Sequence, residues 1–167
     1  MTQASGLFWR ALAAFLALPA IVAGLVPWLL LRDGARFDWI AFPVVVAGTG
    51  LLLWCIRDFY IAGRGTLAPW APPKHLVTVG LYRVSRNPMY LAVLVILAGL
   101  ALGFRSRTLA LYAAGMALVF HLRVVIFEEP WLARTFGEDW PAYRARVPRW
   151  LVWRSGRTVR GHADPPV

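Results

Sequence analysis

The chain has 167 residues, enough for a single domain, and 59% of them are hydrophobic. Soluble domains are only about half apolar, so this composition and a mean hydropathy of +0.58 indicate an integral membrane protein. The net charge of +10 would suit a nucleic-acid-binding protein, but the basic residues lie beside apolar runs. Arginines in such positions reflect membrane topology and contact with anionic lipid, so we expect no nucleic-acid partner.

Four apolar segments are candidates for membrane-spanning helices. They cover residues 11–31, 39–56, 88–104 and 109–127. The first is longer than the apolar core of a signal peptide, which favours a retained transmembrane helix, and Pro19 and Pro27 predict a kink in it. The second contains Cys55, which is predicted to be a small buried residue. A single cysteine excludes an internal disulfide and a paired-cysteine metal site, and we expect no metal.

Short polar turns connect these segments in pairs. RDGARFD joins the first two segments and RSR joins the last two, which predicts two helical hairpins. With four spans, most lysines and arginines fall on the side that holds both termini and the central loop. The positive-inside rule places that side in the cytoplasm. We therefore predict an all-α integral membrane protein with about four transmembrane helices and cytoplasmic termini.

Aromatic and basic residues alternate after the fourth segment. The stretch EEPWLARTFGEDWPAYRARVPRW has amphipathic spacing, which predicts short helices at the cytoplasmic interface. The apolar members of this pattern are Trp131, Leu132, Phe136, Trp140 and Tyr143. In the central loop, the glycines and prolines of GRGTLAPWAPP argue against a helix or strand. Residues 154–167 are predicted to form a disordered tail.

Two glutamates, Glu128 and Glu129, follow the fourth segment directly. Negative charge at the carboxyl end of a helix opposes the helix dipole, so the pair is expected to have a partner. Salt bridges to C-terminal arginines and a site for a cationic, hydroxyl or amino ligand both stay open. His121 lies seven residues before Glu128, which predicts a shared helix face, and a structural hydrogen bond or a site role would suit it. Arg123 is predicted on roughly the opposite side, either reaching the lipid headgroups or serving a site.

The sequence GLYRVSRNPMY, at residues 80–90, precedes the third segment. Pro88 suits the first turn of a helix and Asn87 suits its cap. These roles leave unexplained a group of side chains at the same helix start: Tyr82, Arg83, Arg86 and Tyr90. A helix amino end surrounded by arginines favours a carboxylate or a phosphate. Since this helix start is predicted at the same membrane depth as the two glutamates, an anion site would lie beside a cation site.

The pattern from about residue 63 to residue 150 resembles the isoprenylcysteine carboxyl methyltransferase family and the related phospholipid methyltransferases. The family signature is Arg-His-Pro-x-Tyr-x-Gly, a hydrophobic span, and then Glu-Glu. The corresponding residues are Arg86, Asn87, Pro88, Tyr90, Ala92, Glu128 and Glu129. GLYRVSRNPMYLAV and FGEDWPAYRARVPRW are similar to the bacterial members in particular. Asn87 replaces the signature histidine and cannot become cationic, and Ala92 replaces the glycine and adds one methyl group.

The resemblance implies an integral-membrane methyltransferase that uses S-adenosylmethionine. It places the protein in the bacterial inner membrane, with the active site on the cytoplasmic face. The chain agrees in having no Gly-rich dinucleotide fingerprint. The residues expected to bind the cofactor are Tyr82, Arg83, Arg86, Asn87, Pro88, Tyr90, Glu128 and Glu129. Those expected in catalysis are Arg86, His121 and Glu128. A glutamate would suit the cofactor's amino group or ribose, and Arg86 or Arg83 its carboxylate.

The whole chain is interpreted as one domain. Residues 1–60 would form an amino-terminal helical hairpin, and residues 61–153 the cofactor-binding catalytic region. The methyl acceptor, a membrane lipid or other lipophilic or small molecule, stays open among an isoprenylcysteine-like carboxylate, a lipid amine and a thiol, because no residue is required as a general base. Two alternatives are an NADPH-dependent sterol-type membrane reductase and a non-catalytic scaffold whose arginines bind anionic lipid.

Overall fold

The computed structural model describes residues 19–31, 35–63 and 75–151. Within these ranges the chain forms helices and turns and contains no β-strand, which confirms the predicted all-α class. The start of the first apolar segment, almost all of the GRGTLAPWAPP loop and the tail lie outside the described residues. The predictions made for those parts stay predictions.

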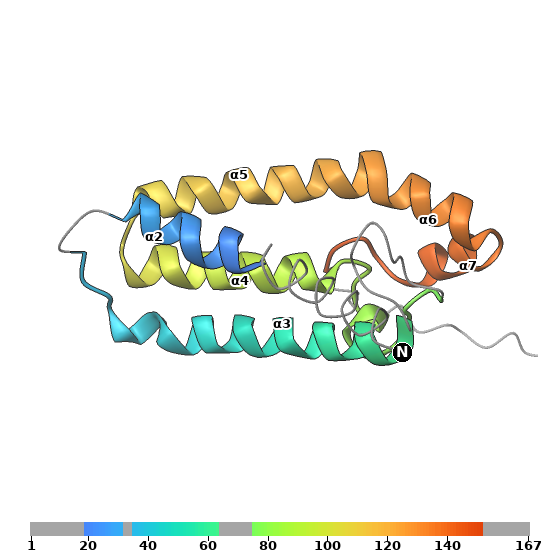
Figure 1. Ribbon diagram of the computed structural model, residues 1–167, viewed down its shortest axis with the longest axis horizontal. Coiled ribbons are helices and arrows are strands. Elements are labelled where there is room, and N and C mark those ends of the chain that lie inside the picture. The colour runs from blue at the N-terminus through green and yellow to red at the C-terminus, as the bar shows by residue number, and fades with distance from the viewer. Residues whose placement is uncertain (1–18, 32–34, 64–74, 152–167) are drawn as a thin grey trace, which may run out of the picture.

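Three long helices form the body of the molecule (Figure 1). Helix α3 covers Phe42–Gly63 and follows a 3₁₀ turn, η2, at Trp39–Ala41. Helix α4 covers Pro88–Gly103 and α5 covers Arg107–Arg123. Helix α4 lies between α3 and α5 and runs antiparallel to both. The short helix α2, Val26–Leu30, packs against α5.

Glycines bring α3 and α4 close together. A methyl group added to Gly48 would lie 2.8 Å from Cγ1 of Ile96, and one added to Gly99 would lie 2.8 Å from Cγ2 of Val45. Both distances are shorter than a normal carbon–carbon contact, so a side chain at either position would force the helices apart. Small residues commonly permit this close approach between membrane helices.

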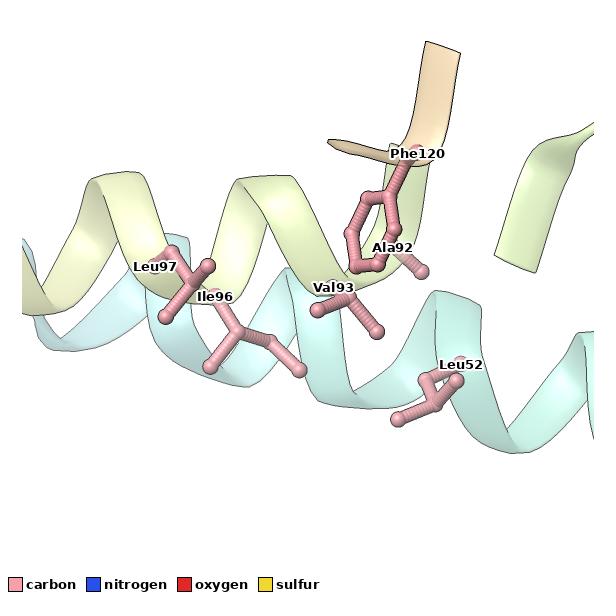
Figure 2. Close-up of a cluster of buried hydrophobic side chains, with 6 residues drawn as sticks. All are labelled: Leu52, Ala92, Val93, Ile96, Leu97 and Phe120. Atoms are coloured by element: carbon pink, nitrogen blue, oxygen red, sulfur yellow. The ribbon is translucent and has the colours of Figure 1, made fainter. Parts of the chain in front are cut away.

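The buried core is centred on α4, where it meets α3 and α5 (Figure 2). Its side chains are Leu52, Ala92, Val93, Ile96, Leu97 and Phe120. Ala92 is fully buried within it. The methyl group that distinguishes Ala92 from the signature glycine therefore belongs to the core of this protein.

Two helical stretches are long and apolar enough to cross a membrane, Trp39–Asp58 and Arg107–Phe136. The helices Ile21–Leu30 and Pro88–Gly103 are apolar but shorter. Sixteen helical residues extend about 24 Å, less than the ~30 Å of a bilayer core. Exposed apolar side chains on α3 and α5 include Leu53, Trp54, Leu111 and Leu118. The structure thus supports membrane association and gives two of the four predicted spans full length.

Two prolines each follow a π-helical turn. Turn η1, Ile21–Leu25, comes shortly before Pro27, and turn η4, Val124–Glu128, comes shortly before Pro130. Proline has no N–H for the carbonyl four residues before it, so it interrupts the α-helical hydrogen bonding. At each turn the next backbone N–H bonds instead to the carbonyl five residues back. The region where a kink is predicted in the first segment therefore contains this wider turn.

The helix that carries the two glutamates does not end at them. Helix α6, Glu129–Phe136, continues directly from η4, and α7, Asp139–Arg146, follows it. The prediction of a helix carboxyl end was therefore wrong. Glu129 instead lies inside a continuous helix, where its backbone N–H donates to the carbonyl of Val124.

The predicted short helices after the fourth segment are present as α6 and α7. Their aromatic side chains partly pack on one another. The buried members of this cluster are Trp140, Tyr143 and Val147, and half-buried Leu132 and Phe136 pack against them. These apolar residues therefore build a small core beside the helix bundle.

Hydrogen bonds, which we call the polar latch, connect the residue before η2 and α3 to the turn between α4 and α5. The backbone N–H of Asp38 donates to the carbonyl of Gly103 at 2.7 Å, and Arg105 donates Nη2 to Asp38 Oδ2 at 2.7 Å. The hydrogen bond from Arg105 holds the pKa of the Asp38 carboxyl below its usual value. Ser106 caps α5 by accepting from the N–H of Leu109. The latch fixes the start of α3 against the turn between α4 and α5.

Candidate functional site

The start of α4 and the junction of α5 with α6 lie toward the same end of the bundle (Figure 1). Hydrogen bonds join them directly: Arg86 bonds to Glu129 and Tyr90 bonds to Glu128. The two halves of the signature therefore meet in the fold, as their predicted membrane depth required. Arg86 and Tyr90 thus each form a hydrogen bond with one of the two adjacent glutamates.

A buried ion cluster surrounds Glu129. We call it the inner cluster, and it consists of Arg86, Glu129 and Arg149. Arg149 donates Nε to Oε1 at 2.7 Å and Nη2 to Oε2 at 2.8 Å, while Arg86 donates Nη1 to Oε1 at 2.9 Å. The Arg86 and Glu129 side chains are only 8% and 10% exposed. Both oxygens of the Glu129 carboxylate thus accept hydrogen bonds from guanidinium groups. One of these groups, that of Arg149, comes from the C-terminal region.

Arg86 is held by several contacts at once. Its guanidinium lies 5.3 Å from the ring centre of Trp140, and its backbone N–H donates to the carbonyl of Pro148 at 2.9 Å. Burial lowers the pKa of Arg86 and the charge of Glu129 opposes that effect, whereas the hydrogen bond to Glu129 raises the pKa of Arg149. In this structure the carboxylate next to the Arg86 guanidinium is that of Glu129, and the predicted pairing of Arg86 with a ligand carboxylate stays a prediction.

A second, more open group surrounds Glu128. We call it the outer cluster, and it consists of Tyr90, Arg123 and Glu128. The Tyr90 hydroxyl donates to Oε1 of Glu128, and Arg123 Nε donates to the same oxygen at 3.0 Å and to the Tyr90 hydroxyl at 3.1 Å. The Arg123 and Glu128 side chains are 60% and 31% exposed. These bonds all converge on Oε1, so within the described residues Oε2 of Glu128 has no hydrogen-bond partner.

The π-turn η4 decides which residues reach Glu128. A wider turn rotates the helix after it relative to the helix before it. Arg123, five residues before Glu128, therefore contacts that carboxylate, while His121 makes its hydrogen bond to Trp150. The predictions that His121 shares the face of Glu128 and that Arg123 lies opposite were both wrong. They assumed uninterrupted α-helical spacing across Val124–Glu128.

Residues 147–151, which we call the C-terminal strap, lie along the start of α4. The carbonyl oxygen of Arg149 accepts from Ser85 Oγ at 3.2 Å and from Asn87 Nδ2 at 3.0 Å. Asn87 does occupy the position before the first turn of α4, but its side chain makes no capping bond because its amide is used by the strap. Its backbone N–H donates to Ser85 Oγ at 3.1 Å. Asn87 is therefore an anchor for the strap.

The other predicted cofactor residues have different surroundings. Tyr82 lies in a buried cluster with Cys55 and Val77, and its carbonyl accepts from the Tyr143 hydroxyl at 2.7 Å. Burial raises the pKa of the Tyr82 phenol. Cys55 is fully buried, as predicted. Arg83 is exposed in the short turn η3, Gly80–Arg83, and Pro88 is the buried first residue of α4.

Sequence reasoning did not single out Arg149 and Trp150. Arg149 forms a two-point ion pair with Glu129, and Trp150 donates to His121 Nδ1 at 3.2 Å. One signal for Arg149 was available, because salt bridges to C-terminal arginines were one of the two explanations for the glutamates. No sequence signal pointed to Trp150, since the fold-back of the strap depends on tertiary contacts.

Comparison with known proteins decides the family. A profile of the phospholipid methyltransferase family matches residues 38–139, which include both halves of the signature. The chain belongs to this family. Nickel-cobalt-cadmium resistance protein NccN from Alcaligenes xylosoxydans xylosoxydans is 31% identical over 157 residues, which cover 92% of this chain and 69% of that protein. No solved structure matches the chain significantly.

Membership in the phospholipid methyltransferase family confirms the resemblance inferred from the signature. It assigns the general class of the protein, because members of the family are methyltransferases, and the two long apolar helices agree with membrane association. The matched region ends at residue 139, so Arg149 and Trp150 lie beyond it. The strap is therefore a part of the site that the family match does not describe.

Proposed function

We propose that this protein is an integral-membrane methyltransferase that uses S-adenosylmethionine and binds it at the outer cluster, on the cytoplasmic side. One observation carries the proposal. The half-exposed carboxylate of Glu128 and the exposed guanidinium of Arg123 lie side by side, 3.0 Å apart, where the two halves of the family signature meet. This arrangement presents both charges to one ligand.

The residues of the outer cluster fit the charged groups of S-adenosylmethionine. An ammonium or a ribose hydroxyl can donate to Oε2 of Glu128, because the described bonds to that carboxylate use Oε1. Arg123 donates through Nε in these bonds, so its terminal nitrogens are suited to the cofactor's carboxylate. Arg86, with Glu129 already bound and only 8% of its side chain exposed, fits this role less well. We therefore assign the carboxylate to Arg123.

The bound cofactor would supply a methyl group already activated by its sulfonium. The protein's contribution is then to align donor and acceptor and to exclude water, which can lower such a barrier by roughly 7–11 kcal/mol. The Tyr90 ring stacks on the Phe120 ring, with 4.5 Å between the ring centres. This contact holds in place the Tyr90 hydroxyl that bonds to Glu128. The inner cluster would hold α4, α6 and the strap in register. The acceptor is a lipophilic or small molecule with a carboxylate, amine or thiol group.

We also propose that the chain crosses the membrane four times, with both termini in the cytoplasm. The distribution of lysines and arginines supports this topology. The short helix Pro88–Gly103 can span if the bilayer thins or if flanking residues reach the headgroups. Labelling of single cysteines, introduced at each loop of a Cys55→Ala background, should mark the Arg105–Arg107 turn from outside and leave the Arg83 loop protected. Labelling of the Arg83 loop from outside would refute the topology.

Calorimetry on detergent-purified protein tests the cofactor assignment. We expect binding of S-adenosylmethionine and of S-adenosylhomocysteine, and none of NADPH. Glu128→Gln should weaken binding, and Glu138→Gln, an exposed control on the neighbouring turn, should not. Binding of NADPH alone would favour the reductase, and binding of none of the three would favour a scaffold. Incubating a membrane lipid extract with methyl-labelled cofactor, and identifying the labelled product, would name the acceptor class.

A further inference from the structure

Arg149 connects two elements of the fold through its own atoms. Its carbonyl oxygen accepts hydrogen bonds from Ser85 Oγ at 3.2 Å and from Asn87 Nδ2 at 3.0 Å, in the segment that leads into α4. Its guanidinium donates to both oxygens of Glu129, the first residue of α6, at 2.7 and 2.8 Å. A single residue of the strap therefore ties the start of α4 to the start of α6.

The two arginines of the inner cluster hold Glu129 in different ways. Arg86 donates one hydrogen bond, from Nη1 to Oε1 at 2.9 Å, and its buried Nε has no hydrogen-bond partner among the described residues. A carboxylate with a single donor can still turn about that bond, whereas two donors from one planar guanidinium fix both of its oxygens. Arg149 supplies this pair of donors, so the orientation of the Glu129 carboxylate depends on Arg149.

The elements that Arg149 joins also carry two residues of the outer cluster. Tyr90 lies in the first turn of α4, and Glu128 directly precedes Glu129 in the continuous helix. The Tyr90 hydroxyl donates to Oε1 of Glu128, so this bond crosses the same junction of α4 with α6 that Arg149 holds. Hydrogen bonds weaken steeply when donor and acceptor move out of line. The bond between Tyr90 and Glu128 therefore depends on how firmly the junction is held.

We propose that Arg149 is a positioning residue that holds the junction of α4 with α6, so that Tyr90 and Glu128 stay paired in the outer cluster. Arg149 lies outside residues 38–139, the region that matches the family profile, so this role is not part of the signature. Its meaning for activity rests on the proposed function. Loss of the Arg149 side chain should weaken cofactor binding although every residue of the outer cluster is still present.

Carbon-13 NMR of protein labelled at tyrosine Cζ tests the pairing without any ligand. The chain has five tyrosines, and the Tyr90 signal is assigned by its loss in Tyr90→Phe. Glu128→Ala gives the position of that signal without the carboxylate. We expect Arg149→Met to shift the signal toward that position, and Arg149→Lys, whose ammonium cannot copy the two-point pair, to shift it less. Arg146→Met is the matched control and should leave the signal unchanged, because Arg146 is exposed and donates Nε to the carbonyl of Ala142 in its own helix.

A second control separates positioning from a general loss of stability. Asp38→Asn weakens the polar latch, which lies at the other end of α4, so it should lower stability and keep the Tyr90 signal of wild type. A wild-type Tyr90 signal in folded Arg149→Met would overturn the proposal. An equal shift of that signal in Asp38→Asn would also overturn it, because the shift would then follow stability alone.

Titration calorimetry on the same variants tests the consequence for binding. Arg149→Met should raise the dissociation constant for S-adenosylmethionine roughly threefold or more, as expected for coupled residues, and Arg146→Met should leave it unchanged. A shifted Tyr90 signal with unchanged affinity would support the positioning role and would remove the outer cluster as the cofactor site. An unshifted signal with lost affinity would overturn the positioning role and would place Arg149 in the ligand site itself.

Discussion

The inner and outer clusters carry similar charged groups on adjacent glutamates, yet they differ in burial and in bonding. Glu129 is 10% exposed and both of its oxygens accept from guanidinium groups. Glu128 is 31% exposed, and the described bonds reach only one of its oxygens. Neighbouring positions in one motif can thus serve different purposes, because the helix turns one carboxylate inward and the other toward the surface.

Burial decides which cluster supports structure. A buried carboxylate keeps its charge only when donors replace the water it has lost, and Glu129 receives three such bonds. Those bonds join α4, α6 and the strap, which are distant in sequence. The outer cluster lies in a more solvated position, where each contact contributes less to folding. It is therefore better suited to exchange its contacts for those of a ligand.

The largest effect is expected from Glu129→Gln, which removes the negative charge of the inner cluster. Two guanidinium groups would then remain partly buried without a counter-ion, and breaking such a pair costs about 3–5 kcal/mol. Chemical denaturation in detergent should show this loss of stability, together with lower yield of folded protein. Glu128→Gln, one residue earlier, is the matched control and should unfold close to wild type. If both variants were equally stable and only Glu129→Gln lost S-adenosylmethionine binding, the inner cluster would be the cofactor site and the outer cluster would not.

The second largest effect is expected on cofactor affinity. If the proposed site is right, Glu128→Gln removes a charge-assisted hydrogen bond to the cofactor, which should raise the dissociation constant for S-adenosylmethionine roughly tenfold or more. The melting temperature should stay close to that of wild type, because Glu128 is half-exposed. Titration calorimetry and a thermal melt on the same sample measure both quantities. Normal affinity in this variant would remove the outer cluster as the cofactor site.

The sequence was sufficient to predict the helical class, the apolar segments and the meeting of the two signature halves. These features follow from local periodicity and from membrane depth, which can be evaluated segment by segment. The positions of His121 and Arg123 were predicted wrongly, because the π-turn before Pro130 shifts the helix face. The pairing of Arg86 with Glu129 could not be distinguished from ligand binding, since both explanations use the same residue types. Trp150 was missed because only the folded strap brings it to His121.

A smaller effect is expected from Arg86→Lys. Lysine can still approach Glu129, but its single ammonium cannot reach Glu129 and also replace the guanidinium group that lies 5.3 Å from the ring centre of Trp140. A partly buried cation–π contact contributes up to about 2 kcal/mol, so stability should fall by about 1–2 kcal/mol. The exposed neighbour gives a matched control, and Arg83→Lys should change stability by less than about 0.5 kcal/mol. If Arg86→Lys instead kept its stability and lost cofactor affinity, Arg86 would belong to the ligand site.

The smallest effect is expected from Asn87→Ala, and it concerns the position where the family signature has histidine. The Asn87 amide donates to the carbonyl of Arg149 at 3.0 Å, and Ser85 donates to the same oxygen at 3.2 Å. The carbonyl therefore keeps one donor after the substitution, and stability should fall by only about 1 kcal/mol. Turnover and cofactor affinity should stay near wild type, because the side chain faces the strap and makes no described contact with the outer cluster. Chemical denaturation measures the stability, and a methyl-transfer assay on the same preparation measures turnover and cofactor dependence. Turnover that falls much further than stability would show that Asn87 acts on the reaction itself, and that the strap anchor and the ligand site overlap.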